Sequence, residues 1–174
     1  DEYASVFSLK MKTRLNKRSY HIIINPTLDC NLRCWYCYES HKKGSRISQE
    51  TVDAIFNHIE LKYAEDKFEK LELSFFGGEP LLKAKTVCLI IERISEFCIQ
   101  NNILLTISFT TNGTILPQSI LSVLKDKKVT FQITLDGIKK QHNSVRGFKN
   151  VSDSNSYEII WKNIQKLYDK IQNL

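Results

Sequence analysis

The sequence has no long apolar run. In its 174 residues, no uninterrupted apolar stretch approaches the roughly 20 residues that a membrane-spanning helix needs. Residues 1–14 also lack the apolar core that a signal peptide carries. We therefore expect no membrane partner. The missing initiator methionine, and an end that falls within a helical pattern, predict a fragment or a processed chain.

Low-complexity segments and a disulfide framework are also missing. The five cysteines are an odd number, and three of them are bunched, which does not fit paired disulfides. A reducing compartment, the cytoplasm, is therefore expected. With 42% hydrophobic residues, the chain can bury a core and is predicted to form one domain.

A basic charge pattern that would indicate nucleic-acid binding is not evident either. The net charge of +6 permits an anionic partner. However, lysines such as Lys125, Lys127 and Lys128 fit the solvated surface of a helix, and no folded RNA-binding motif accompanies them. We do not expect nucleic acid as a partner.

Four short apolar runs rich in β-forming residues predict strands. They are residues 20–24, 71–76, 103–109 and 129–135. The first and third are nearly continuous apolar stretches, which predicts strands buried on both faces.

Helical patterns lie between and after these runs. One begins after Ser48, a suitable N-cap, and another spans residues 83–100. A shorter helix is expected to open with Pro117 at its first position, and a last one to follow Ser156. The alternation predicts an α/β fold with a parallel sheet and right-handed crossovers.

Every predicted strand leads into a loop of unusual composition. These loops are the three-cysteine segment 27–40, GGEP (77–80), TTNGT (110–114), and DG (136–137) followed by HNSVRG (142–147). Glycine, asparagine and aspartate also form ordinary turns, which explains any one loop taken alone. Because the carboxyl ends of parallel strands meet at one edge, we expect the four loops to form a site there.

The three bunched cysteines, Cys30, Cys34 and Cys37, predict a soft-metal site, either zinc or an iron–sulfur cluster. Structural zinc needs a fourth ligand, for which His41 and Cys88 are candidates. Cys88 lies on a predicted helix, where a buried apolar role is more typical. A [4Fe–4S] cluster held by three cysteines instead leaves one iron open to another ligand. The tight spacing without a second cysteine pair favours the cluster.

Together these motifs resemble the radical S-adenosylmethionine (radical SAM) superfamily. The Cys-x3-Cys-x2-Cys pattern has Tyr36 before its last cysteine, and FFGGEP, TTNG and TLDG follow at the ends of the next three predicted strands. With an H…R pair, the set resembles most the anaerobic sulfatase-maturating enzymes and SPASM-type peptide maturases, over about residues 20–170. The resemblance implies a partial TIM barrel with four of six βα units present, in a core over residues 20–174 after a lead-in segment 1–19. The two further units and the SPASM region would be absent from this sequence.

The resemblance also implies cofactors and roles. Cys30, Cys34 and Cys37 would ligate a [4Fe–4S] cluster whose open iron binds S-adenosylmethionine. The remaining implied cofactor-binding residues are Tyr36 beside the adenine, Gly77, Gly78 and Glu79 at the amino group, Asn112 or Thr111 and Asp136 near the ribose or substrate cavity, and Arg146 at the carboxylate. His142 is interpreted as a loop residue.

The implied activity is reductive cleavage of S-adenosylmethionine to a 5′-deoxyadenosyl radical, which removes hydrogen from a peptide or protein. A flavodoxin or ferredoxin would supply electrons. The residue that accepts a proton from the substrate is expected in the absent part, so no catalytic residue is assigned. Two alternatives stay open: an RNA-modifying radical SAM enzyme and a non-catalytic zinc-binding domain.

Overall fold

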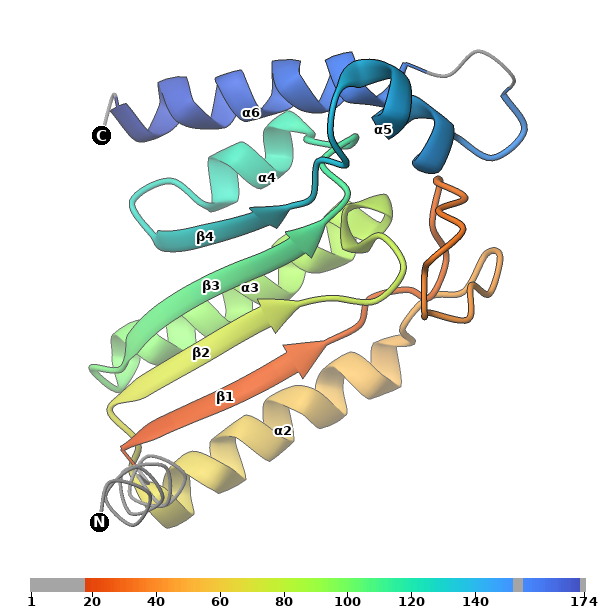
Figure 1. Cartoon of the computed structure of the whole chain (residues 1–174). Helices are drawn as coiled ribbons and strands as arrows, with labels where there is room; N and C mark the ends of the chain where they lie inside the picture. The colour runs from red at the N-terminus through yellow and green to blue at the C-terminus, as the bar shows by residue number, and fades with distance from the viewer. Residues whose placement is uncertain (1–17, 152–154, 173–174) are drawn as a thin grey trace, which may run out of the picture.

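Four parallel strands form the centre of the molecule. The computed structural model describes residues 18–151 and 155–172. Its strands are β1 (Ser19–Ile24), β2 (Lys70–Phe75), β3 (Leu104–Thr111) and β4 (Lys128–Ile133). They form one sheet in chain order, and each neighbouring pair is parallel (Figure 1). The predicted α/β fold with four βα units is confirmed.

Helices follow each strand. They are α2 (Gln49–Asp66), the 3-10 helix η1 (Pro80–Lys83), α3 (Ala84–Gln100), α4 (Gln118–Val123), α5 (Lys139–Val145) and α6 (Ser156–Gln172). Ser48 is the N-cap of α2, and its hydroxyl accepts the Thr51 amide hydrogen at 3.2 Å. The four predicted helices are confirmed.

Two local details differ from the sequence prediction. Pro117 is the N-cap of α4 with an extended backbone, and the first helical residue is Gln118. The segment around His142, which the sequence predicts to be a loop, forms the short helix α5. Its sequence KKQHNSV has no apolar stripe, so periodicity gave no signal for a helix.

The apolar face of the sheet packs against helices and forms the core. Figure 1 shows α3 behind the sheet and α2 alongside β1, and both helices contribute residues to the core. Phe75, Phe109 and Phe131 stand side by side on β2, β3 and β4, with ring centroids 5.1 and 5.0 Å apart. Phe75 and Phe109 are fully buried, and each such ring contributes about 1.5–3 kcal/mol. This layer of rings lies near the ends of the strands and supports the loops that follow.

The opposite face of the sheet is polar, so the prediction that β1 and β3 are buried on both faces was wrong. Burial alternates along both strands, and Ile23 on β1 is 61% exposed. Ser74 on β2 hydrogen-bonds His21 at 2.7 Å and Ser108 at 2.6 Å across three strands. An apolar run in one strand does not reveal which side chains its neighbours place beside it.

The predicted lead-in segment 1–19 lies outside the described residues except for its last two, and Ser19 already begins β1. In the part of the chain that the structure describes, no helix has the length and apolar character to cross a membrane.

Candidate functional site

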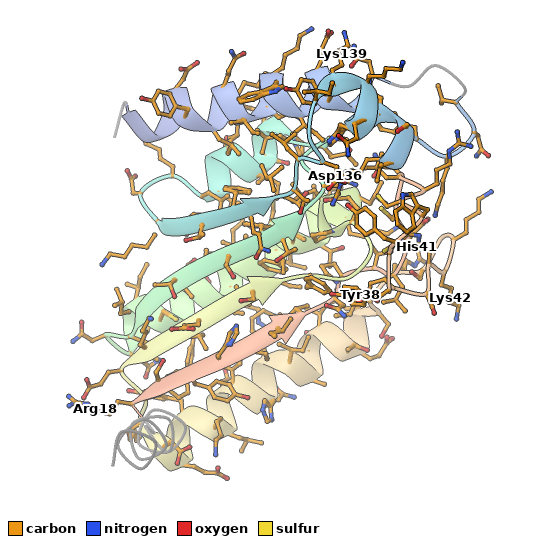
Figure 2. The ribbon with its side chains drawn as sticks, in the orientation of Figure 1. Arg18, Tyr38, His41, Lys42, Asp136 and Lys139 are labelled. Carbon is orange, nitrogen blue, oxygen red and sulfur yellow. The ribbon has the colours of Figure 1, made fainter. Side chains whose placement is uncertain are left out.

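The loops after the four strands meet at one edge of the sheet. The register pairs Ile24 with Phe75, Phe75 with Phe109, and Phe109 with Phe131, so the strands end at similar levels. Figure 2 shows Tyr38, His41 and Lys42 at the end of the sheet where Asp136 follows β4, while Arg18 lies at the opposite end. The predicted convergence of strand-end loops is therefore present.

The thiol loop, residues 27–37, contacts the GGEP loop backbone to backbone. The amides of Gly78 and Glu79 donate to the carbonyls of Thr27 at 3.1 Å and Asp29 at 2.8 Å. A Cβ atom at Gly78 would lie 2.2 Å from the Asp29 carbonyl oxygen, and one at Gly77 (φ 111°) would lie 2.4 Å from that of Thr27. Both glycines are needed for this close approach.

A second segment, residues 147–149, holds the thiol loop from the other side. Leu32 and Phe148 form an isolated antiparallel bridge. The Arg33 amide donates to the Gly147 carbonyl, and the Lys149 amide donates to the Asn31 carbonyl, both at 2.9 Å. Sequence patterns gave no indication of this pairing, because it joins two irregular segments.

The three cysteines differ in environment. Cys30 is 6% exposed, Cys34 is partly buried and Cys37 is exposed. Burial raises the pKa of the Cys30 thiol, and the amide hydrogen of Leu32 partly offsets that effect. Burial also raises the pKa of Cys34, which the charge of Arg146 lowers in part. Since a bound metal holds cysteines as thiolates, cluster binding would displace these protons.

The thiols do not form a closed site for one ion. Within residues 18–151 and 155–172, no three His, Cys, Asp or Glu side chains converge as a single metal ion requires. Of the two candidate fourth ligands, His41 has its Nε2 atom 3.5 Å from Cys37 Sγ, whereas Cys88 lies on α3 against the core. A cluster with irons at separate corners does not need its thiols to meet at one point, and three soft thiolates suit it.

Glu79 is completely buried beneath this edge. Its carboxylate accepts hydrogen bonds from the Leu81 amide at 3.0 Å, the Thr111 hydroxyl at 2.7 Å and the Asn112 amide at 2.7 Å. Burial raises the pKa of Glu79, and these donors offset part of the rise. A carboxylate has about four acceptor positions, and these three donors fill three of them.

Asp136, Tyr36 and Arg146 form a second cluster. Asp136 Oδ2 accepts from the Tyr36 hydroxyl at 2.5 Å and from Arg146 Nε at 2.6 Å. The guanidinium carbon also lies 5.5 Å from the centre of the Tyr36 ring. This arrangement ties the thiol loop to the segments that follow β4.

The cluster shifts the acidity of its members. Partial burial raises the pKa of the Asp136 carboxyl, but the Tyr36 and Arg146 hydrogen bonds outweigh it, and the pKa lies below its ordinary value. Burial, and then the bond to Asp136, raise the pKa of Tyr36 to about 12. The phenol therefore stays protonated and keeps donating at neutral pH.

His142 is buried in α5, not exposed on a loop. Its Nδ1 atom accepts the Asp136 amide hydrogen at 3.2 Å, and its ring meets Tyr157 edge-on with centroids 5.6 Å apart. His142 thus fixes the backbone of Asp136.

Asn112 lies at the floor of the site, 7% exposed, against Cys30. The sequence placed it, or Thr111, near the ribose or the substrate cavity. That placement stays a prediction, and in the structure the Asn112 side chain contacts Asn31 and Thr114.

The fold and the site define a radical SAM core, and comparison with known proteins gives the family. The chain matches the model of the radical SAM superfamily over residues 24–173, and it belongs to that family. Membership implies the family's two cofactors, a [4Fe–4S] cluster and S-adenosylmethionine. The alternative of a non-catalytic zinc domain finds no support in this match.

Individual relatives differ in what they act on. A probable GTP 3′,8-cyclase of Methanocaldococcus jannaschii is 29% identical over 163 residues, which cover 91% of this chain and 49% of the relative. A structure of anSMEcpe with bound AdoMet and Cp18Cys peptide has a TM-score of 0.69 at 23% identity, covering 87% of this chain and 40% of that one. Streptococcus suis SuiB bound to precursor peptide SuiA has a TM-score of 0.55 at 17% identity, covering 94% of this chain and 35% of SuiB.

These two structures show the shared fold, a partial radical SAM barrel. This chain spans less than half the length of each of the three proteins.

Proposed function

We propose that this chain carries the cofactor-binding part of a radical SAM enzyme that modifies a peptide or protein. The observation that carries the proposal is the position of the thiol loop, held in backbone contact with the GGEP loop. In the proposal, Cys30, Cys34 and Cys37 ligate the [4Fe–4S] cluster. In the same proposal, a ligand of the open iron lies beside Gly77, Gly78 and Glu79, which the loop contact supports.

The other strand-end residues complete the proposed cofactor site. Tyr36 lies beside the adenine, with its hydroxyl on Asp136. Arg146 provides a cation for the methionine carboxylate. Asp136 lies on the side of the ribose, and Asn112 lies on the side of the cluster, next to Cys30. When bound and reduced, these cofactors supply a 5′-deoxyadenosyl radical that removes hydrogen from the substrate.

The fold likeness to anSMEcpe and SuiB supports a peptide or protein as the substrate, because both were solved with peptides. The polar sheet face adds to this support. The hydroxyl groups of Ser74 and Ser108 on this face can form hydrogen bonds with the amides of a peptide. The positive charges of Lys70 and Lys128 lie at the other ends of β2 and β4, away from the strand-end loops. A second candidate is cyclisation of a nucleotide, which the likeness to the probable GTP 3′,8-cyclase favours.

A flavodoxin or ferredoxin is the proposed electron donor, and the cytoplasm the proposed compartment. All five cysteines are free thiols, as a reducing compartment requires.

The test is anaerobic cluster reconstitution in the full-length protein, followed by an assay for 5′-deoxyadenosine under reducing conditions. The wild type should bind four irons and form 5′-deoxyadenosine, and Cys34→Ala should lose both properties. Cys88→Ala is the matched control, because that thiol lies on α3 against the core and should be dispensable. A wild type that holds its cluster and never cleaves S-adenosylmethionine would overturn the proposal.

Substrate class is tested separately. GTP added to the reduced wild type should leave the rate of 5′-deoxyadenosine formation unchanged if peptides are the substrates. A GTP-dependent rise in that rate, with a cyclised nucleotide as product, would favour the second candidate.

A further inference from the structure

Asn112 is hydrogen-bonded to the sulfur of a proposed cluster ligand. Its side-chain nitrogen Nδ2 lies 3.6 Å from Cys30 Sγ and 2.8 Å from Asn31 Oδ1. An amide nitrogen carries two hydrogens, so it can donate to both acceptors at once. Both Asn112 and Cys30 are buried, which protects the contact from competing water.

The orientation of the Asn112 amide is fixed by its surroundings. Its oxygen Oδ1 accepts from the Thr114 backbone amide at 2.9 Å and from the Thr114 hydroxyl at 2.7 Å. A backbone amide can only donate, so the oxygen must face Thr114. The nitrogen then has to face Cys30, and the N–H···S contact does not depend on an arbitrary choice of rotamer.

The sulfur of Cys30 receives hydrogen bonds from two separate parts of the chain. Cys30 has two N–H donors, because the Leu32 amide also points to its sulfur at 3.5 Å. Cys37 is exposed, and its sulfur contacts His41 Nε2 at 3.5 Å. Of the two donors to Cys30, the Leu32 amide belongs to the thiol loop itself, whereas Asn112 reaches it from the end of β3.

We infer that Asn112 raises the reduction potential of the cluster through its hydrogen bond to Cys30. Reduction adds an electron to the cluster and its thiolates, and N–H donors stabilise the more negative state. Asn112 is thus a positioning residue that acts through Cys30 and does not contact the substrate. The inference rests on the proposed ligation of the cluster by Cys30 and is independent of the substrate class.

Asn112 also contacts Glu79, so the residue that would tune the reduction potential touches the predicted amino-group site as well. The Asn112 backbone amide donates to Glu79 Oε2 at 2.7 Å, while its side chain contacts Cys30. One residue therefore joins the predicted amino-group site to the buried sulfur.

The test is a redox titration of the reconstituted full-length protein, followed by electron paramagnetic resonance of the reduced cluster. Asn112→Leu removes the donor with little change in volume and should shift the midpoint potential to a more negative value. At one fixed potential, the ratio of reduced to oxidised cluster should fall by about threefold to tenfold, as expected if a charge-assisted hydrogen bond gains about half its strength on reduction. Asn112→Asp keeps an acceptor for Thr114 and should shift the potential further, because a carboxylate repels the sulfur.

Thr114→Val is the matched control. It removes the hydroxyl from the same network but leaves the Thr114 amide that orients Asn112. Its potential should equal that of the wild type. Equal shifts in Asn112→Leu and Thr114→Val would overturn the inference in favour of a general loosening of the loop, and so would an unchanged potential in Asn112→Leu.

A spectroscopic arm decides the case in which the Asn112 variants fail to fold. Wild-type protein labelled with ¹⁵N-asparagine should show a weak coupling between the reduced cluster and a side-chain amide nitrogen in pulsed resonance. Absence of that coupling would overturn the inference. A wild type that takes up a cluster without cleaving S-adenosylmethionine would overturn the proposed function and leave this result standing.

Discussion

Glu79 and Asp136 are two carboxylates at the same edge of one sheet, and they are held in opposite ways. Glu79 is fully buried and takes three neutral donors, two of them backbone amides. Asp136 is partly exposed and is paired with the charged Arg146 and the phenol of Tyr36. Accordingly, the pKa of Glu79 lies above its ordinary value and that of Asp136 below it.

The difference indicates that Glu79 is held in place by the fold, whereas the hydrogen-bond partners of Asp136 can change. Glu79 connects the GGEP loop, η1 and the end of β3, so it orders the floor of the site before any ligand binds. Asp136 holds two side chains, Tyr36 and Arg146, that the proposed function assigns to the cofactor, so these interactions would be exchanged on cofactor binding.

The largest effect is expected from Glu79→Ala. Removing the carboxylate leaves three donors without an acceptor, each costing about 1–3 kcal/mol, so the free energy of unfolding should fall by about 3–9 kcal/mol. Urea denaturation of the full-length protein measures it. Glu72→Ala, on the polar face of β2, is the control and should change stability by about 0.5 kcal/mol or less. Equal losses in the two variants would contradict the structural role of Glu79.

Asp136→Asn should have a smaller effect. It keeps the shape of the side chain but removes the charge opposite Arg146, whose side chain is only 10% exposed. A hydrogen bond to a charged group contributes about 1.5–3 kcal/mol, and the loss in stability should lie in that range. A loss as large as that of Glu79→Ala would remove the distinction drawn between the two carboxylates.

The pH dependence should follow from the direction of the Asp136 shift. Its folded-state pKa is lowered, so acidification protonates the unfolded chain first and favours unfolding. The stability difference between wild type and Asp136→Asn should be full above about pH 4 and shrink as the pH falls through the lowered pKa. For Glu79, whose pKa is raised, the sign is reversed, because the folded state takes up its proton first. Thermal unfolding of both proteins from pH 7 to pH 3 tests this, and a difference that grows on acidification would contradict it.

Tyr36→Phe should have the smallest effect. It removes one hydrogen bond to Asp136 but keeps the ring beside Arg146, and should cost about 0.5–1.5 kcal/mol. If the ring lies beside the adenine, the KM for S-adenosylmethionine should stay within about threefold of wild type in Tyr36→Phe and rise in Tyr36→Leu. Equal KM values in these two variants would count against the adenine contact.

Much of the fold could be predicted from sequence because its signals are local. The helix after Ser48 and the helix over residues 83–100 each have an apolar stripe and begin close to where the pattern indicates. Helix α5 has no stripe, and it is held by the buried ring of His142, which is a tertiary contact. The second face of β1 was mispredicted for the same reason, since its character depends on Ser74 and Ser108 in other strands.

The site divides in the same way. The three cysteines and the strand-end glycines were found because their types and order are distinctive. The burial of Glu79, and the direction in which the Asn112 amide points, were not predictable. The environment of Glu79 depends on donors from Thr111 and Asn112, more than 30 residues away. The direction of the Asn112 amide depends on the backbone amide of Thr114.

The pairing of the thiol loop has a consequence for the order in which the protein is made. The loop is supported on one side by Gly78 and Glu79 and on the other by residues 147–149. Both supports are synthesised after the three cysteines, the second more than 100 residues later. During translation the thiols therefore leave the ribosome well before the segments that support them. A chain that ends before residue 147 has the three ligands of the proposed cluster but lacks the segment that supports one side of the thiol loop.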